Sequence, residues 1–281
     1  MERVEEMADR AEKVTRFRAL HAGEGAFVIP NPWDRGSAIL LEQAGFKALA
    51  TTSAGFANAQ GLPDTAVGRE MMLDHCREIA AATALPVSAD LENGFADAPA
   101  DVADCIRLAA ETGLAGGSIE DASSDPDEPI YEFGFAVERV QAAAEAARGV
   151  DGGFVLTARS ENFLHGRPDL GDTIRRLQAF QEAGAEVLYA PGLSRLEDIA
   201  TLVRAVDRPV NVLPNAALSA VTLAEYSRLG VKRLSLGSLL ARVAYGALIA
   251  SADQIAGKGR FDLATNSIPY AKLNGRFTAP G

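Results

Sequence analysis

"VSADLENGF", residues 87–95, is the stretch that decides how this chain is interpreted. Its first residues are apolar or small, as in a buried strand, and the turn signal Asn93-Gly94 closes it. Between strand and turn stand two carboxylates, Asp90 and Glu92, and no basic residue lies near them in the sequence. Two acids at the end of a buried strand need a partner for their charge, which must come from another part of the fold or from a ligand.

The same order of segments recurs eight times along the chain. Each unit has a short apolar or β-branched run, a polar loop, and an amphipathic stretch rich in Ala, Leu, Glu and Arg. Strands that alternate with helices pair in parallel, so eight units predict an α/β fold of the (β/α)8 barrel type. The strands are expected at 26–30, 47–53, 85–92, 114–121, 154–161, 186–192, 209–214 and 233–238.

Helical stretches separate these strands, and several end in glycine just before the next strand. Glycine is the expected C-terminal stop of a helix. No G-x-G-x-x-G motif follows the first strand, which disfavours a dinucleotide-binding sheet. The expected helices include 36–45, 101–113 and 171–184, and the stop glycines are Gly45, Gly113, Gly184 and Gly230.

Residues 1–281 are interpreted as one barrel domain, because no linker or low-complexity tract divides them. We expect an N-terminal helix, over 4–20, to plug the bottom of the barrel. The tail after Ser251 is expected to extend into a partner subunit.

Composition excludes several classes of partner. The formal net charge is −11, without a stripe of Lys and Arg, so nucleic-acid binding is not expected. The charged N-terminus is not a signal peptide, and no apolar run is long enough to cross a membrane. Cys76 and Cys105 lie in helical patterns and are interpreted as buried thiols of a cytoplasmic protein.

Acidic side chains follow two neighbouring strands at the end where barrel enzymes carry their active sites. Asp90 and Glu92 are two residues apart, so an extended strand would project both to one face, and Glu120 adds a third carboxylate. Converging carboxylates repel one another unless a cation neutralises them, and oxygen-only ligands suit Mg²⁺ or Mn²⁺. The alternative is that these acids cap the following helices.

Basic and small residues complete the predicted site. Arg159, after the fifth strand, suits bidentate binding of a substrate carboxylate or phosphonate, or a salt bridge to Glu161 or Glu120. The turn Ser53-Ala54-Gly55 offers a hydroxyl and backbone N–H groups to an oxyanion, although a plain turn explains it equally well. The three histidines do not cluster, so a serine–histidine–aspartate triad has no support.

Taken together, these segments resemble the isocitrate lyase/phosphoenolpyruvate mutase superfamily. The resemblance runs from about residue 15 to 250 and rests on 31–64, 85–95, 116–121 ("GGSIED"), 156–163 ("LTARSENF") and 182–192. It implies a (β/α)8 barrel whose eighth helix is swapped between subunits in homodimers or homotetramers. It also implies chemistry at C–C or P–C bonds next to a carboxylate, through Mg²⁺-stabilised enolate-like species.

The resemblance assigns a role to each matching position. Ser53, Ala54 and Gly55 resemble the turn that binds the substrate carboxylate, and Asn215 resembles a polar contact after the seventh strand. The remaining positions are Asp64, similar to a mobile-loop acid; Asp90, similar to the principal metal-holding aspartate; Glu92, where the family usually has a second aspartate; Glu120, similar to the next metal-shell carboxylate; and Arg159, similar to the carboxylate-binding arginine.

One loop departs from the family pattern. Lyases that cleave isocitrate or methylisocitrate carry a K-[KR]-C-G-H loop after the fourth strand, and phosphonate mutases carry a lysine there. The loop 122–135, "ASSDPDEPIYEFGF", has no Cys, Lys or His, which argues against both activities. Tyr131 or Glu132 remain candidates to enter the site from this loop, although its acids are more often simply solvated.

The predicted function is that of a Mg²⁺-dependent enzyme acting at a C–C bond of a small 2-oxo or 2-hydroxy di- or tricarboxylic acid. A lyase, an oxaloacetate-type decarboxylase and a hydrolase all remain open. Glu120 and Arg159 would support catalysis, and Asp64 or a loop residue would handle protons. The alternatives are a P–C bond enzyme acting on phosphonopyruvate and a non-catalytic barrel that binds a 2-oxo acid.

Overall fold

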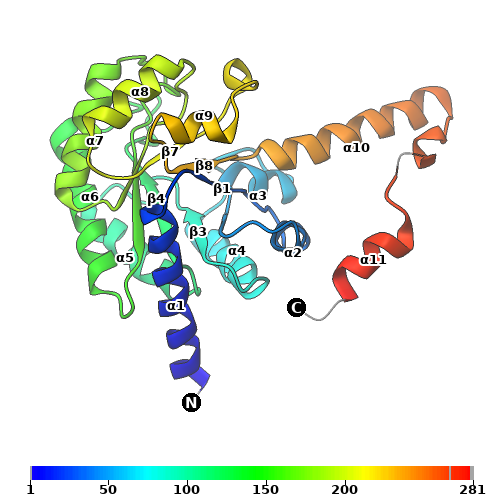
Figure 1. The fold of residues 1–281 in the computed structure, drawn as a ribbon, viewed down its shortest axis with the longest axis horizontal. Helices are drawn as coiled ribbons and strands as arrows, with labels where there is room; N and C mark the ends of the chain where they lie inside the picture. Colours follow the sequence, from blue (N-terminus) through cyan, green and yellow to red (C-terminus); the bar gives the residue numbers. More distant parts are fainter. Residues whose placement is uncertain (1, 266, 279–281) are drawn as a thin grey trace.

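Eight parallel strands form the centre of the computed structural model, which describes residues 2–265 and 267–278 (Figure 1). Their order is β1-β8-β7-β6-β5-β4-β3-β2, and a backbone hydrogen bond of 3.0 Å from Ala50 N to Pro30 O joins the two outer strands. The predicted (β/α)8 barrel is therefore confirmed. The strands are β1 (Phe27–Ile29), β2 (Leu49–Ala50), β3 (Val87–Asp90), β4 (Gly116–Glu120), β5 (Val155–Arg159), β6 (Val187–Tyr189), β7 (Val210–Val212) and β8 (Arg233–Ser235).

Helices surround the strands and occupy the crossovers between them. The four predicted stop glycines all have positive φ, between 87° and 111°, a conformation that residues with a Cβ rarely adopt. The helices are α1 (Glu2–Ala22), α2 (Arg35–Gln43), α3 (Ser53–Ala59), α4 (Arg69–Ala81), α5 (Pro99–Ala110), α6 (Phe133–Gly149), α7 (Leu170–Ala183), α8 (Leu196–Ala205), α9 (Leu223–Arg228), α10 (Leu239–Lys258) and α11 (Tyr270–Thr278), with short 3-10 turns η1 (Ala216–Leu218) and η2 (Asp262–Thr265).

The predicted strands are longer than the observed ones at two functional positions. The second strand ends at Ala50, and Ser53 already begins α3 because the Thr52 side chain caps that helix. The third strand ends at Asp90, and Glu92 has a φ of 48°, in the left-handed region. The expectation that Asp90 and Glu92 share one face of an extended strand is therefore wrong.

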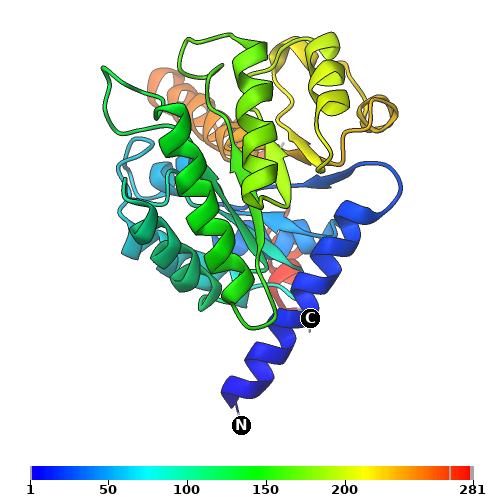
Figure 2. The ribbon, with the colours of Figure 1, turned by 90° about the vertical axis from the view of Figure 1, so that its left-hand side faces the viewer.

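The bottom of the barrel is closed by α1, as the sequence predicted. Val14 and Phe17 are fully buried and pack against Val155 and Val187 in a separate apolar cluster. Figure 2 shows α1 running beneath the strands. This apolar plug seals one end of the barrel and leaves the other end for polar chemistry.

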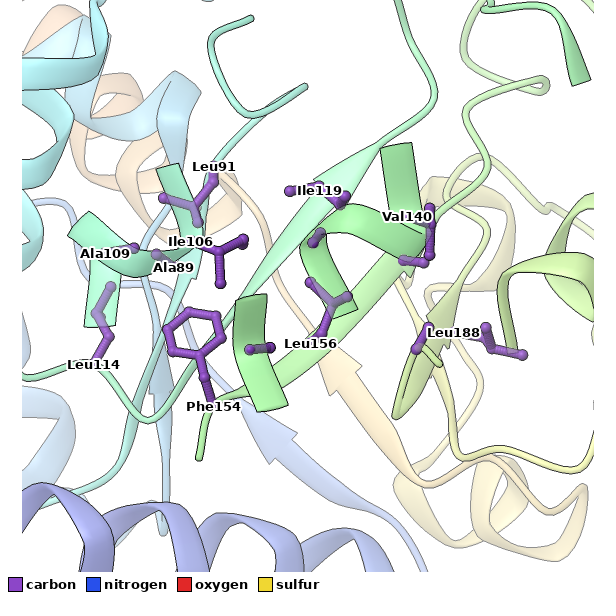
Figure 3. Packing of buried hydrophobic residues seen from close by; sticks show 14 of the residues in the cluster. Ala89, Leu91, Ile106, Ala109, Leu114, Ile119, Val140, Phe154, Leu156 and Leu188 are labelled. Carbon is purple, nitrogen blue, oxygen red and sulfur yellow. The ribbon is translucent and has the colours of Figure 1, made fainter. Parts of the chain in front are cut away.

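The main core lies between the strands and the outer helices. Outward-facing strand residues such as Ile119 and Leu156 belong to the same buried cluster as Ile106 and Val140 from α5 and α6 (Figure 3). Many helix residues in this cluster are alanines, which let the helices approach the sheet closely. The rigid strand ends that result are the platform for the site.

The C-terminal arm, residues 239–278, leaves the barrel (Figure 1). In α10 only Ala241 is buried, whereas Val243, Leu248 and Ile249 are about 60 % exposed, at 62, 61 and 59 %. The arm returns to its own barrel at α2, where Gln43 Nε2 donates to the Arg276 carbonyl at 2.5 Å. Among the described helices, none is long and apolar enough to cross a membrane.

Candidate active site

Three side chains predicted from separate strands meet at the mouth of the barrel, which is the end formed by the carboxyl termini of the strands. Arg159, the last residue of β5, binds Asp90 Oδ1 at 2.7 Å and Glu120 Oε2 at 3.0 Å. Its Nε donates to Glu161 Oε1 at 2.8 Å. All four side chains are at most 22 % exposed. One guanidinium is thus surrounded by three carboxylates in a largely dry site.

Burial and repulsion set the charge states of this cluster. Burial opposes the charge of Arg159, but Glu120, Glu161 and Asp90 together raise the pKa of its guanidinium well above the usual value. Burial also raises the pKa of Glu120, and Glu161 and Asp90 reinforce the effect. The salt bridges considered for Arg159 from the sequence are therefore present, and one guanidinium faces three carboxyl groups.

Glu92 reaches the same region from the turn after β3. Its Oε1 is buried and has no hydrogen-bond partner among the described residues. Burial first, and then the charges of Asp90 and Asp64, raise the pKa of its carboxyl to about 7. A carboxylate oxygen that is buried without a donor is costly unless a cation or a proton compensates its charge.

The Ser53 turn binds Asp90 in this structure. Ser53 Oγ donates to Asp90 Oδ2 at 2.9 Å, and Ser53 N lies 3.3 Å from the same oxygen. Ser53 and Ala54 line the cavity at the mouth, whereas Gly55 is buried behind them. An added Cβ on Gly55 would lie 2.6 Å from the Thr52 side chain, so the turn needs glycine there.

Of the two remaining predicted residues, Asp64 lines the cavity and Asn215 does not. Asp64, in the loop between α3 and α4, lines the cavity, and burial together with the Asp90 charge raises its pKa. Asn215 does not line this cavity: its Nδ2 donates to the Leu193 carbonyl at 2.8 Å, and its Oδ1 accepts from Ala217 N at 3.1 Å. In this structure Asn215 stabilises the loop after β7.

The divergent loop 122–135 is held by its own contacts. Tyr131 donates to Asp97 Oδ1 at 2.5 Å and accepts from Asn93 Nδ2 at 3.1 Å. Glu132 accepts from Phe135 N at 3.1 Å and caps α6. Neither side chain lines the cavity at the mouth. The two candidates from this loop therefore serve its structure.

The cavity has a volume of about 230 Å³ and extends below the mouth into the barrel. The sequence reasoning missed two of its lining residues, Tyr189 and Arg233, which are buried on β6 and β8. The signal was present, because a charged residue opens the otherwise buried run "RLSLGS". Asn31 joins the strand ends nearby, since its Oδ1 accepts from Leu236 N and Gly237 N at 2.8 and 3.0 Å.

The donor set at the mouth fits a hard divalent cation by chemistry. Asp90, Glu92 and Glu120 offer only carboxyl oxygens, and these three groups outnumber the one guanidinium beside them. The described residues, 2–265 and 267–278, contain no cluster of three or more His, Cys, Asp or Glu side chains that could hold a metal ion. Mg²⁺ does not require one, because it usually keeps several waters and takes one or two carboxylates.

Barrel, site and sequence together define a class of protein, and the family follows from direct comparison. A family model described as phosphoenolpyruvate phosphomutase matches residues 17–256. The chain belongs to this family, within the isocitrate lyase/phosphoenolpyruvate mutase superfamily, which confirms the resemblance seen in the sequence.

Two curated relatives show the range of this similarity. An uncharacterized protein of Mycobacterium tuberculosis is 33 % identical over 264 residues, covering 92 % of this chain and 95 % of the relative. The 2-methylisocitrate lyase of Escherichia coli (strain K12) is 29 % identical over 202 residues, covering 69 % of this chain and 67 % of that enzyme.

Solved structures share the fold. A protein from Burkholderia cenocepacia J2315, provisionally described as a lyase/mutase, is 52 % identical with a TM-score of 0.95 and covers 97 % of this chain and 98 % of that chain. Phosphonopyruvate hydrolase with oxalate and Mg²⁺ has a TM-score of 0.83 at 23 % identity, covering 94 % and 95 %. Oxaloacetate acetylhydrolase with the product oxalate has 0.84 at 24 %, covering 95 % and 94 %.

Proposed function

We propose that this chain is a Mg²⁺- or Mn²⁺-dependent enzyme that makes or breaks a C–C bond in a small 2-oxo or 2-hydroxy di- or tricarboxylic acid. The observation that carries the proposal is the number of carboxyl groups at the mouth: three surround Arg159, and Glu92 adds a fourth whose buried Oε1 has no hydrogen-bond partner among the described residues. Relatives named for 2-methylisocitrate and oxaloacetate chemistry support a small carboxylate substrate.

Asp90, Glu92 and Glu120 are the residues that would hold the metal. The ion would supply positive charge to the substrate oxygen on which negative charge develops as the bond breaks. Phosphonopyruvate hydrolase, which shares the fold, binds oxalate and Mg²⁺, and this supports the choice of metal. Because Asp90 and Glu120 now pair with Arg159, their turning to a cation would release that guanidinium.

The released Arg159, together with Ser53 and Ala54, would then bind the substrate carboxylate. Gly55 would keep this turn tight. Asp64 is the acid or base of the proposal, because it lines the cavity and its raised pKa lets it carry a proton closer to neutral pH. Asn215 would contribute indirectly, through the loop that it stabilises.

The reaction subtype follows from what the loop 122–135 lacks. Because this loop lacks the cysteine of the K-[KR]-C-G-H pattern, it offers no acid or base for isocitrate-type cleavage. Decarboxylation or hydrolysis of an oxaloacetate-like acid is therefore favoured. The second candidate is P–C bond chemistry on phosphonopyruvate, which the name of the matching family favours and the missing lysine disfavours. Turnover of any acid would exclude the third candidate, a non-catalytic binding barrel.

The test is a substrate panel with metal control. Oxaloacetate, malate derivatives, methylcitrate analogues and phosphonopyruvate are incubated with the purified chain in EDTA and after Mg²⁺ or Mn²⁺ is restored. Pyruvate, oxalate and phosphate release identify the bond that is cut. Metal-dependent C–C cleavage supports the proposal, whereas phosphate release from phosphonopyruvate alone selects the second candidate.

We further propose that the C-terminal arm is exchanged between subunits of a homodimer or homotetramer. The exposed apolar side chains of α10 support this, because such a surface is rarely left open to water. Light scattering on the wild type and on a Val243→Asp/Leu248→Asp variant tests it. A wild type that is monomeric at micromolar concentration would contradict the proposal.

A further inference from the structure

Arg233 is the second guanidinium that lines the cavity, and it lies deeper than Arg159. Its Nη2 donates at 3.0 Å to the hydroxyl of Thr157, a side chain two residues below Arg159 on β5. Two residues along a strand correspond to about 6.6 Å, so the two guanidinium groups belong to successive layers of the barrel. We call the deeper layer, formed by Arg233, Asn211 and Thr157, the cavity floor.

Among the described residues, every hydrogen-bond acceptor of Arg233 is neutral. Its Nε donates to Asn211 Oδ1 at 2.8 Å, and its Nη1 lies 3.4 Å from His21 Nε2. His21 Nδ1 lies 2.8 Å from the Phe17 carbonyl, which only accepts, so Nε2 is the acceptor toward Arg233. Burial and the Arg233 charge lower the pKa of His21 to about 3, which keeps this imidazole neutral.

The positive charge of Arg233 is therefore uncompensated. The residue is 4 % exposed, and none of the described carboxylates lies within 4.0 Å of its guanidinium. Burial lowers its pKa to about 10, so it remains charged near neutral pH. A guanidinium carries five N–H groups, of which three point to Asn211, Thr157 and His21; the other two have no acceptor among the described residues, and Arg233 lines the cavity.

The surroundings leave room for an anion above this charge. Four small residues, Ala50, Ser88, Ser118 and Ser235, line the cavity together with bulkier ones such as Ile29 and Tyr189, and a volume of about 230 Å³ remains open between them. The two acids that line the cavity, Asp64 and Asp90, belong to the mouth. An anionic group that enters from the mouth would therefore meet a guanidinium without a counter-ion, that of Arg233, at the floor.

We propose that Arg233, positioned by Asn211 and Thr157, forms a carboxylate-binding subsite at the cavity floor that holds a second acidic group of the substrate. Arg233 is then a specificity residue that separates dicarboxylates from monocarboxylates. The existence of the subsite stands on the geometry alone, whereas the identity of its ligand as a substrate group rests on the proposed function.

The test uses malonate as a probe of two linked carboxylates and acetate as its single-carboxylate control, both measured by calorimetry on the full chain in EDTA. Two variants remove the free charge by opposite routes: Arg233→Gln deletes it, and Asn211→Asp neutralises it. Both are expected to weaken malonate binding by about tenfold or more, which corresponds to the loss of a charge-assisted hydrogen bond. Arg139→Gln, at a buried arginine outside the cavity, is the matched control.

The outcomes separate the inference from the proposed function. Equal malonate affinity in wild type, Arg233→Gln and Asn211→Asp, or no malonate binding by the wild type, overturns the subsite. If Arg233→Gln does not fold, Asn211→Asp decides alone. With an active substrate in hand, Arg233→Gln is expected to raise KM by about tenfold with kcat within about threefold. Absence of any turnover, with Arg233-dependent malonate binding intact, would overturn the proposed function and leave the subsite standing.

Discussion

Arg159 and Arg233 are both buried inside the barrel, yet their electrostatic surroundings are opposite. Arg159, at the mouth, has three carboxylates within 3.0 Å. Arg233, at the floor, has only neutral acceptors. The mouth therefore lacks positive charge and the floor lacks negative charge. A divalent cation at the mouth and a small dicarboxylate reaching the floor would together match both surroundings, which favours a ligand-binding role for the cavity.

The strongest way to break this comparison is to remove Asp90. Asp90→Ala deletes a proposed metal ligand and the acceptor of both Ser53 and Arg159. We expect kcat/KM on an active substrate to fall by about 10³-fold or more, which is about 4 kcal/mol of transition-state stabilisation. Steady-state kinetics with Asp104→Asn, an exposed acid on α5, as the control measure this. A fall of less than tenfold would contradict the assignment of Asp90.

Removing the guanidinium of Arg159 tests, through protein stability, how far the carboxyl groups at the mouth depend on it. Arg159→Gln leaves Asp90, Glu120 and Glu161 close together without their shared positive charge. In metal-free buffer the free energy of unfolding should fall by about 3 kcal/mol, because buried charges lose their partner. Urea denaturation with and without Mg²⁺ measures this, and Mg²⁺ should restore part of the loss. Equal stability of wild type and variant in metal-free buffer would show that the mouth tolerates the acids unaided.

A negative charge added at the cavity floor tests whether Arg233 lacks a counter-ion. Asn211→Asp places a carboxylate beside Arg233 Nε, where the wild type has a neutral amide oxygen. The free energy of unfolding should rise by about 1 kcal/mol, because a buried cation gains a counter-ion. Thermal unfolding near pH 7.5 gives the sign. A destabilised Asn211→Asp protein would mean that Arg233 is already balanced.

The last expected effect is the pH dependence of stability due to Glu92. Its pKa is about 7 in the folded chain against 4.5 for an unperturbed glutamate. Between these values the folded state keeps a proton that the unfolded state has released, so the contribution to stability is present below pH 4.5 and is lost as the pH rises toward 7. Glu92→Gln removes this slope. Metal-free wild type should therefore lose stability relative to Glu92→Gln between pH 5 and pH 7.5. Parallel curves of unfolding free energy against pH for the two proteins would contradict the raised pKa of Glu92.

The fold was predictable because its signals are local and repeated. Eight apolar runs, the helices between them and glycines such as Gly184 specify the barrel, and the N-terminal helix lies at the bottom, where it was expected. Strand ends were less predictable. Thr52 capping α3 and the left-handed turn at Glu92 both end a strand earlier than hydrophobicity suggests, because cap and turn geometry depend on the loops that follow.

The meeting of Asp90, Glu120 and Arg159 was predictable, whereas the contacts of Arg233 were not. Asp90, Glu120 and Arg159 stand at strand ends, where parallel topology brings them together. Arg233 was missed because it opens a run otherwise interpreted as buried core. Its partners, from β5, β7 and α1, lie between 22 and 212 residues away in the sequence, so local sequence patterns do not reveal them.

The central claim is that the acids at the mouth bind a divalent cation needed for turnover. The most direct measurement is calorimetric titration of Mg²⁺ into the metal-free wild type and the Asp90→Ala variant, paired with turnover of the panel substrates in EDTA. The account predicts one Mg²⁺ site per chain that is lost in Asp90→Ala, and turnover that stops in EDTA and returns with Mg²⁺. Turnover that is unchanged by chelation, or Mg²⁺ binding that is equal in both proteins, would contradict it.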